Sequence, residues 1–179
     1  MTNEDTTQVA IQDSRLRHIH FTGSVKNGQL IQRALSISSA PFRSLGLELG
    51  GKDPAYVRND VDVKRVAEEI ADGAFFNSGQ SCCGLERVYV HHSIYDAFVD
   101  ELVRVAESYT LGDPMKQETT LGPVISQHAA TLIRQHIQDA IQRGAKQRVD
   151  LSKFPADDVR LRFPIFVSYP NMIREKGRL

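Results

Sequence analysis

Short apolar runs with strand character alternate with amphipathic helical stretches along most of this chain, and this alternation limits the folds open to it. Residues 18–22, 43–49, 55–57 and 87–91 have the composition and spacing of strands. The stretch from 25 to about 38 has helical periodicity instead. Strands that alternate with helices are typical of α/β proteins with a mainly parallel sheet.

The later helical stretches have expected start and stop residues. Asp60 is the expected N-cap of a helix whose apolar residues follow the i, i+3, i+4, i+7 pattern. Ser93 followed by Asp96 resembles a capping box for the next helix. Ser126 is the expected cap of a helix that Gly144 ends, and the apolar stripe expected to face inward is Ala129, Ile133, Ile137 and Ile141.

Composition and charge exclude several classes of function. The 179 residues suffice for about one domain with its own core, and 41% hydrophobic with 25% charged residues is typical of a globular protein. Lys and Arg balance Asp and Glu at 22 each, which argues against a nucleic-acid partner. No segment approaches the roughly 20 apolar residues that cross a membrane. Without a secretory signal or a disulfide framework, a cytoplasmic, reduced location is expected.

The stretch FTGSVKNG joins the first expected strand to the first expected helix. Gly23 and Gly28 bracket the start of the helix, where a backbone free of side chains can approach a phosphate and unpaired N–H groups can bind it. Ser24 adds a hydroxyl. A tight turn without a ligand remains an alternative, since the stretch lacks the G-x-G-x-x-G pattern of dinucleotide-binding folds.

The stretch LELGGKDP places Glu48 between two leucines at the end of an expected strand. A carboxylate with apolar neighbours beside a flexible Gly50-Gly51 turn suits a general base. An exposed strand-end glutamate with no catalytic role is the alternative.

The two cysteines are adjacent in FFNSGQSCCG. A disulfide between them is disfavoured, because successive Cα atoms lie about 3.8 Å apart and disulfides prefer roughly 4.4–6.8 Å. No metal site is expected, since His91 and His92 lie beyond a predicted strand and no other ligand is near. Two interpretations remain for each thiol: a small buried hydrophobe, or a nucleophile that follows a glycine turn.

Together, FTGS, LELGGKDP and FFNSGQSC resemble, in order and spacing, three motifs of the aldehyde dehydrogenase superfamily. The resemblance runs from about residue 9 to 149. It implies that Cys82 is the nucleophile and Glu48 the general base. It also implies that Gly23, Ser24, Gly28 and Leu49 bind the cofactor, NAD or NADP. The expected reaction oxidises a small-molecule aldehyde to a carboxylic acid through a thiohemiacetal and a thioester on cysteine.

The resemblance covers the middle of the family sequence only. Residues 1–50 correspond to the end of the NAD(P)-binding domain, 51–150 to the start of the catalytic domain, and 151–179 form a divergent tail without a clear period. Full-length relatives form homo-oligomers, but their oligomerisation segments have no counterpart here. The expected fold is therefore an incomplete aldehyde-dehydrogenase-like α/β fold, parallel sheets with flanking helices.

Three functions are compatible with these motifs. The first is an aldehyde dehydrogenase in truncated form, with little or no activity alone. The second is a non-catalytic relic or interaction chain that keeps the family signature. The third is a weak thiol esterase that uses Cys82 and Glu48 without cofactor. The sequence decides neither between NAD and NADP nor which aldehyde is oxidised.

Overall fold

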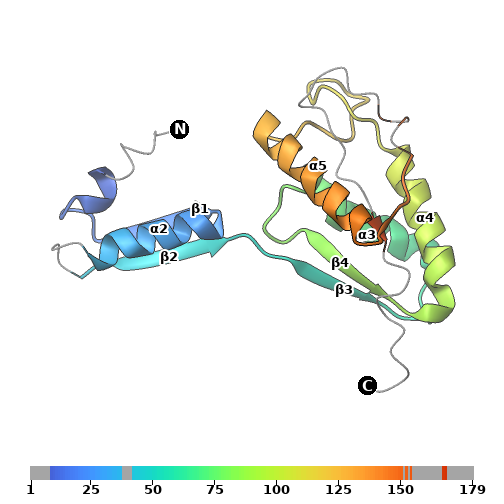
Figure 1. The fold of residues 1–179 in the computed structure, drawn as a ribbon, viewed down its shortest axis with the longest axis horizontal. Helices are drawn as coiled ribbons and strands as arrows, with labels where there is room; N and C mark the ends of the chain where they lie inside the picture. The colour runs from blue at the N-terminus through green and yellow to red at the C-terminus, as the bar shows by residue number, and fades with distance from the viewer. Residues whose placement is uncertain (1–8, 38–41, 151, 153, 155–166, 169–179) are drawn as a thin grey trace. The chain divides into compact units, whose positions relative to one another are not determined.

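The computed structural model describes residues 9–37, 42–150, 152, 154, 167 and 168. The chain divides into two units, Met1–Gly51 and Lys52–Leu179, and each contains a parallel two-stranded sheet (Figure 1). Each of these two parallel sheets has a helix packed against it, so the predicted α/β architecture is confirmed.

The first unit is a strand–helix–strand arrangement. Strand β1 (His18–Gly23) pairs in parallel with β2 (Ser44–Leu49), and helix α2 (Val25–Ser36) lies along the pair (Figure 1). Parallel strands need a long crossover between them, which is where the helix falls. The pairing runs from His18 opposite Ser44 to Gly23 opposite Leu49, so both strands end at the same edge.

The second unit begins with a similar arrangement. Strand β3 (Asp53–Val57) pairs in parallel with β4 (Leu85–Val90), and α3 (Val63–Phe75) lies between them in sequence and packs against β4. A short 3₁₀ segment, η1 (Phe76–Gly79), follows α3 and leads to the cysteines. The lysine at the start of the unit is held to β4, since the Arg87 guanidinium donates to the Lys52 carbonyl at 2.8 Å.

The rest of the second unit is mostly helical. After the 3₁₀ segment η2 (His92–Ile94), α4 (Tyr95–Ser108) packs against α3, and α5 (Gln127–Gln142) follows a long loop (Figure 1). Gly144, with a φ of 94°, ends the helical region as predicted, because a left-handed residue after a helix favours glycine. Strand β5 (Lys146–Gln147) then pairs antiparallel with β6 (Val167–Ser168).

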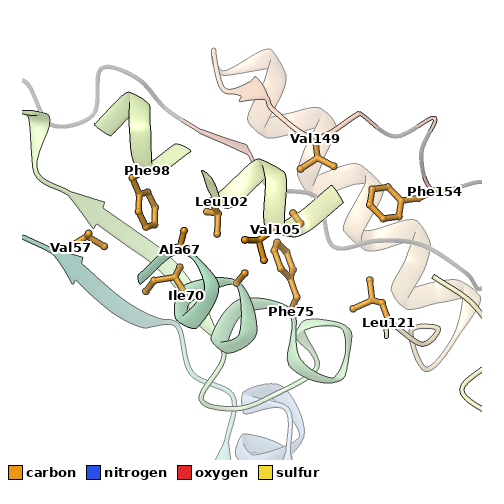
Figure 2. Packing of buried hydrophobic residues seen from close by; sticks show 12 residues of the cluster. Val57, Ala67, Ile70, Phe75, Phe98, Leu102, Val105, Leu121, Val149 and Phe154 are labelled. Carbon is orange, nitrogen blue, oxygen red and sulfur yellow. The ribbon is translucent and has the colours of Figure 1, made fainter. Parts of the chain in front are cut away.

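The core of the second unit lies where α4 meets α3 and the sheet. Figure 2 shows Phe98 and Leu102 of α4 beside Ala67 and Ile70 of α3. Ala67 is 0% exposed and Ile70 8%, so the apolar stripe predicted for α3 is its buried face. Phe98, 1% exposed, and Leu102, 2% exposed, form the buried face of α4. The buried cluster contains Val57, Ala67, Ile70, Ala71, Phe75, Phe98, Leu102, Val105, Ala106, Leu121, Val149 and Phe154.

Two predicted helix caps were wrong. Helix α3 is capped by Asp62, whose carboxylate accepts from the backbone N–H of Arg65 at 3.2 Å, while Asp60 forms an ion pair with Arg58. Ser93 does not cap α4, since its hydroxyl contacts the His91 ring at 2.9 Å and α4 begins without a side-chain cap. In both cases the predicted cap interacts with a neighbouring side chain instead: Asp60 with Arg58, and Ser93 with His91.

The last helix was predicted correctly at its start and only in part along its face. Ser126 caps α5 by accepting from the N–H of Ala129 at 3.1 Å. The fully buried residue of the helix is Ala130, whereas Ile141, expected inside, is 43% exposed. Most of the predicted divergent tail, 151–179, lies outside the described residues.

Candidate active site

The predicted phosphate turn and Glu48 lie at one edge of the first sheet. In the parallel register, Thr22 is opposite Glu48 and Gly23 is opposite Leu49. Neighbouring strands are about 4.8 Å apart, so the carboxyl ends of β1 and β2 present these residues side by side. Ligands of open α/β sheets bind outside the carboxyl ends of the strands. Glu48 is exposed at this edge.

The start of α2 has the features of an anion site. The Ser24 side chain caps the helix by accepting from the backbone N–H of Asn27 at 3.2 Å. The N–H groups of Val25 and Lys26 precede the first helical hydrogen bond, so the helix gives them no partner. The first turn contains no acidic residue and includes the cationic Lys26. This end of the helix therefore fits a diphosphate group.

Gly28 supports this turn from inside the unit. It is buried, and a Cβ added there would lie 2.9 Å from Cδ2 of Leu49. Glycine therefore lets α2 lie close against β2, which holds the helix start beside the end of the strand. Direct contact between Gly28 and a cofactor stays a prediction, as do the cofactor contacts of Gly23, Ser24 and Leu49.

The two cysteines occupy the centre of a β-turn between η1 and β4. The N–H of Gly84 donates to the Ser81 carbonyl at 3.3 Å, which closes the turn around Cys82 and Cys83. Both thiols are free and exposed. Ser81 Oγ lies 3.3 Å from the sulfur of Cys83. Exposure of both side chains argues against the alternative in which either one fills the core.

The backbone before this turn adopts an unusual conformation. Asn77, Ser78 and Gly79 have φ values of 50°, 60° and 74°, so three successive residues are left-handed. This conformation costs about 1–2 kcal/mol for a residue with a side chain, less for asparagine. Such strain persists only where surrounding contacts maintain it, and it occurs often at functional sites.

Side-chain hydrogen bonds maintain this left-handed segment. The Asn77 amide donates to the Gln80 carbonyl at 3.1 Å, and the Gln80 amide donates to the Asn77 carbonyl at 3.0 Å. Ser78, 4% exposed, donates to the carbonyl of Gly122 at 2.7 Å. The other amide atom of Gln80, Oε1, accepts from the N–H of Ile125 at 2.7 Å. Sequence reasoning missed these partners, because they lie more than forty residues further along the chain.

Phe75, the last residue of α3, is packed into the core. Phe75 is 6% exposed and its ring meets Tyr109 edge to face, with centroids 5.9 Å apart. Burial, and then the charge of Asp72, raise the pKa of Tyr109, so its phenol stays neutral near pH 7. The cysteine turn therefore follows a helix whose last residue is packed into the core.

The structure also bears on metal and membrane binding. Within the ranges that the structure describes, no three His, Cys, Asp or Glu side chains group as metal ligands. None of the described helices combines the length and apolar content needed to cross a bilayer.

Comparison with known proteins identifies the family. The profile of the aldehyde dehydrogenase family matches residues 1–162, so the chain belongs to the aldehyde dehydrogenase family. An NADP(+) succinate-semialdehyde dehydrogenase from Schizosaccharomyces pombe is 38% identical over 129 residues, which is 72% of this chain and 25% of that protein.

Solved structures show the same relationship. An NADP-dependent glyceraldehyde-3-phosphate dehydrogenase from Bacillus halodurans, complexed with NADP, superposes with a TM-score of 0.80 at 31% identity, covering 93% of this chain and 33% of that one. A succinate-semialdehyde dehydrogenase from Burkholderia pseudomallei has a TM-score of 0.83 at 28% identity. The match covers 94% of this chain and 34% of that one. This chain thus spans about a quarter to a third of the length of its relatives.

Proposed function

We propose that this chain carries the nucleophile, the general base and the cofactor-phosphate turn of an NAD(P)-dependent aldehyde dehydrogenase. The observation that carries the proposal is the register of β1 and β2, which places Glu48 and Leu49 beside Thr22 and Gly23 at one carboxyl edge. The free and exposed thiol of Cys82 supports its proposed role as the nucleophile. Membership in the family supports the chemistry that links the three.

In the proposed reaction, the Cys82 thiolate attacks the carbonyl carbon of an aldehyde and forms a C–S bond. The backbone N–H of Cys82 donates to the oxygen that becomes negative. NAD or NADP, held by the turn from Gly23 to Gly28, would supply the acceptor for the hydride that leaves the same carbon. Glu48 then takes a proton from a water whose oxygen attacks the resulting thioester. The C–S bond breaks, Cys82 regains its thiolate, and a carboxylic acid leaves.

The first unit supplies the proposed cofactor contacts. The free N–H groups at the start of α2, together with Ser24 and Gly23, face a diphosphate, and Lys26 adds positive charge. Leu49 lies beside them at the end of β2 and contributes apolar contact. These residues suit NAD and NADP equally, because a diphosphate is common to both.

We expect the 179 residues alone to give no measurable dehydrogenase turnover. Cys82 is exposed, whereas thioester chemistry of this kind proceeds in sites that exclude bulk water. One turn and one strand end provide few of the simultaneous contacts that dinucleotide affinity requires. A reducing compartment such as the cytoplasm suits the proposal, because the nucleophile must remain a free thiol.

Thiol alkylation tests the nucleophile. We expect limiting iodoacetamide to modify Cys82 several-fold faster than Cys83, as measured by peptide mass spectrometry. The Cys83→Ser variant should leave the rate at Cys82 unchanged. Equal rates at the two cysteines would contradict the assignment and favour a non-catalytic chain that keeps the signature.

Two absorbance assays separate the remaining functions. When aldehyde and NAD or NADP are added, we expect the absorbance at 340 nm to rise no faster than in a Cys82→Ala control. Hydrolysis of 4-nitrophenyl acetate that depends on both Cys82 and Glu48, without cofactor, would support a thiol esterase. A robust Cys82-dependent signal at 340 nm would overturn the expectation that this chain is inactive alone.

A further inference from the structure

The Gln80 side chain joins two segments that are distant in sequence. Its amide nitrogen donates to the Asn77 carbonyl at 3.0 Å, and its amide oxygen accepts from the N–H of Ile125 at 2.7 Å. A donor meets a carbonyl and an acceptor meets an N–H, so one orientation of the amide satisfies both bonds. The Gln80 backbone N–H also donates to the Asn77 carbonyl, at 3.2 Å, so the distinct contribution of the side chain is its bond to residues 122–125.

Residues 122–125 form a firm support. Leu121 is 3% exposed and Val124 is 2% exposed, so core side chains flank the two backbone groups that receive Ser78 and Gln80. Leu121 also bridges to Leu111, and its carbonyl accepts from the N–H of Gly112 at 3.1 Å. A bond from Gln80 to this segment therefore connects to the rigid part of the second unit.

The cysteine turn has little other attachment. Within the part of the chain that the structure describes, the hydroxyl of Ser81 contacts only Cys83, and the N–H of Gly84 bonds back to Ser81. The turn is therefore held at its far end by β4 and at its near end by Gln80. Gln80 is itself exposed, so it contributes these hydrogen bonds rather than core packing.

We propose that Gln80 is a positioning residue for the nucleophile: through Ile125 it fixes the Ser81–Gly84 turn and so the direction in which the backbone presents Cys82. This inference rests on the proposed function, since it gives Gln80 a role toward the thiol that reacts. Ser78 anchors the same segment through Gly122, but it is buried, so we expect its loss to destabilise the unit rather than to act on Cys82 alone.

The test compares Gln80→Ala with the unmodified chain in two measurements. We expect the preference of iodoacetamide for Cys82 over Cys83 to fall at least threefold. Hydrogen exchange at the Ile125 amide should become at least tenfold faster, because that amide loses its acceptor. The thermal midpoint of unfolding should change little, since Gln80 is exposed.

Two further variants make the result specific. Gln138→Ala removes an exposed glutamine of α5 and should change neither measurement. Gln80→Glu keeps an oxygen that accepts from Ile125 but loses the donor to Asn77, so it should preserve exchange protection at Ile125 and restore part of the preference for Cys82.

Each outcome decides a different point. If the unmodified chain shows no preference for Cys82, the proposed nucleophile fails and the inference fails with it. If that preference exists and Gln80→Ala keeps it, the inference alone is overturned. A fall in thermal midpoint with an unchanged Cys82 to Cys83 ratio would assign Gln80 a structural role only.

Discussion

At the residue scale, small side chains decide how the candidate site is held. Gly28 has no Cβ, and this lets α2 approach Leu49 beside the general-base candidate Glu48. Asn77 and Ser78 accept left-handed backbone because hydrogen bonds to Gln80 and Gly122 offset its cost. The sequence indicated that the glycines were important, but it did not separate a ligand contact from a packing contact.

Enlarging Gly28 should disturb the first unit. Gly28→Val places methyl groups where Leu49 lies and should lower the free energy of unfolding of that unit by about 1–3 kcal/mol. Denaturant titration followed by NMR of the β1 and β2 amides measures this. Gly50→Val is the matched control, because no atom lies within 4 Å of its added Cβ. An equal loss in both variants would contradict the packing role of Gly28.

The Asp13 carboxylate provides a pH-dependent contact. Hydrogen bonds from the Arg15 guanidinium, and then from its backbone N–H, lower the pKa of Asp13 to about 2. Because the folded pKa is below the ordinary value of about 3.9, the stabilisation is present above pH 4 and is lost as pH falls toward 2. Arg15→Ala should raise the Asp13 pKa, as measured by NMR titration. Arg17→Ala should leave it at about 2.

At the element scale, competing local partners decide which side chain caps a helix. Both Asp60 and Asp62 precede the apolar stripe of α3, and Asp60 was the predicted cap. Arg58 pairs with Asp60, and Asp62 has the extended backbone that an N-cap requires. The same competition removed Ser93 from the start of α4, where His91 takes its hydroxyl.

The assignment of the α3 cap can be measured directly. Asp62→Ala should lower the free energy of unfolding of the second unit by about 1 kcal/mol, because it removes the acceptor for the Arg65 N–H. Asp60→Ala removes only an exposed ion pair and should cost less than about 0.5 kcal/mol. Chemical denaturation monitored by circular dichroism compares them. A larger loss for Asp60→Ala would restore the original assignment.

At the scale of the whole molecule, the buried apolar side chains are unevenly divided. Among the described residues, the cluster beneath α3 and α4 belongs to the second unit. The buried hydrophobic side chains described in the first unit are Ile11 and Ile31. A two-stranded sheet with so few buried apolar side chains among its described residues is expected to be marginally stable.

We therefore expect the two units to open at different free energies. Amides of β1 and β2 should exchange with solvent at least about tenfold faster than amides in the centres of α3 and α4. Hydrogen exchange followed by NMR gives both rates from one sample. Equal protection in the two units would show that they unfold cooperatively, contrary to this expectation.

The sequence by itself determined the α/β alternation, the parallel pairing, the apolar faces of α3 and α4, and the family to which the three motifs belong. These follow from local periodicity and short motifs, which a single chain displays without its partners. The tertiary structure alone decided which aspartate caps α3, that Gly28 packs against Leu49, and that Gln80 reaches Ile125. The reason is physical: a side chain bonds to the partner that the folded backbone places nearest, and for Gly28 and Gln80 that partner is distant in the sequence.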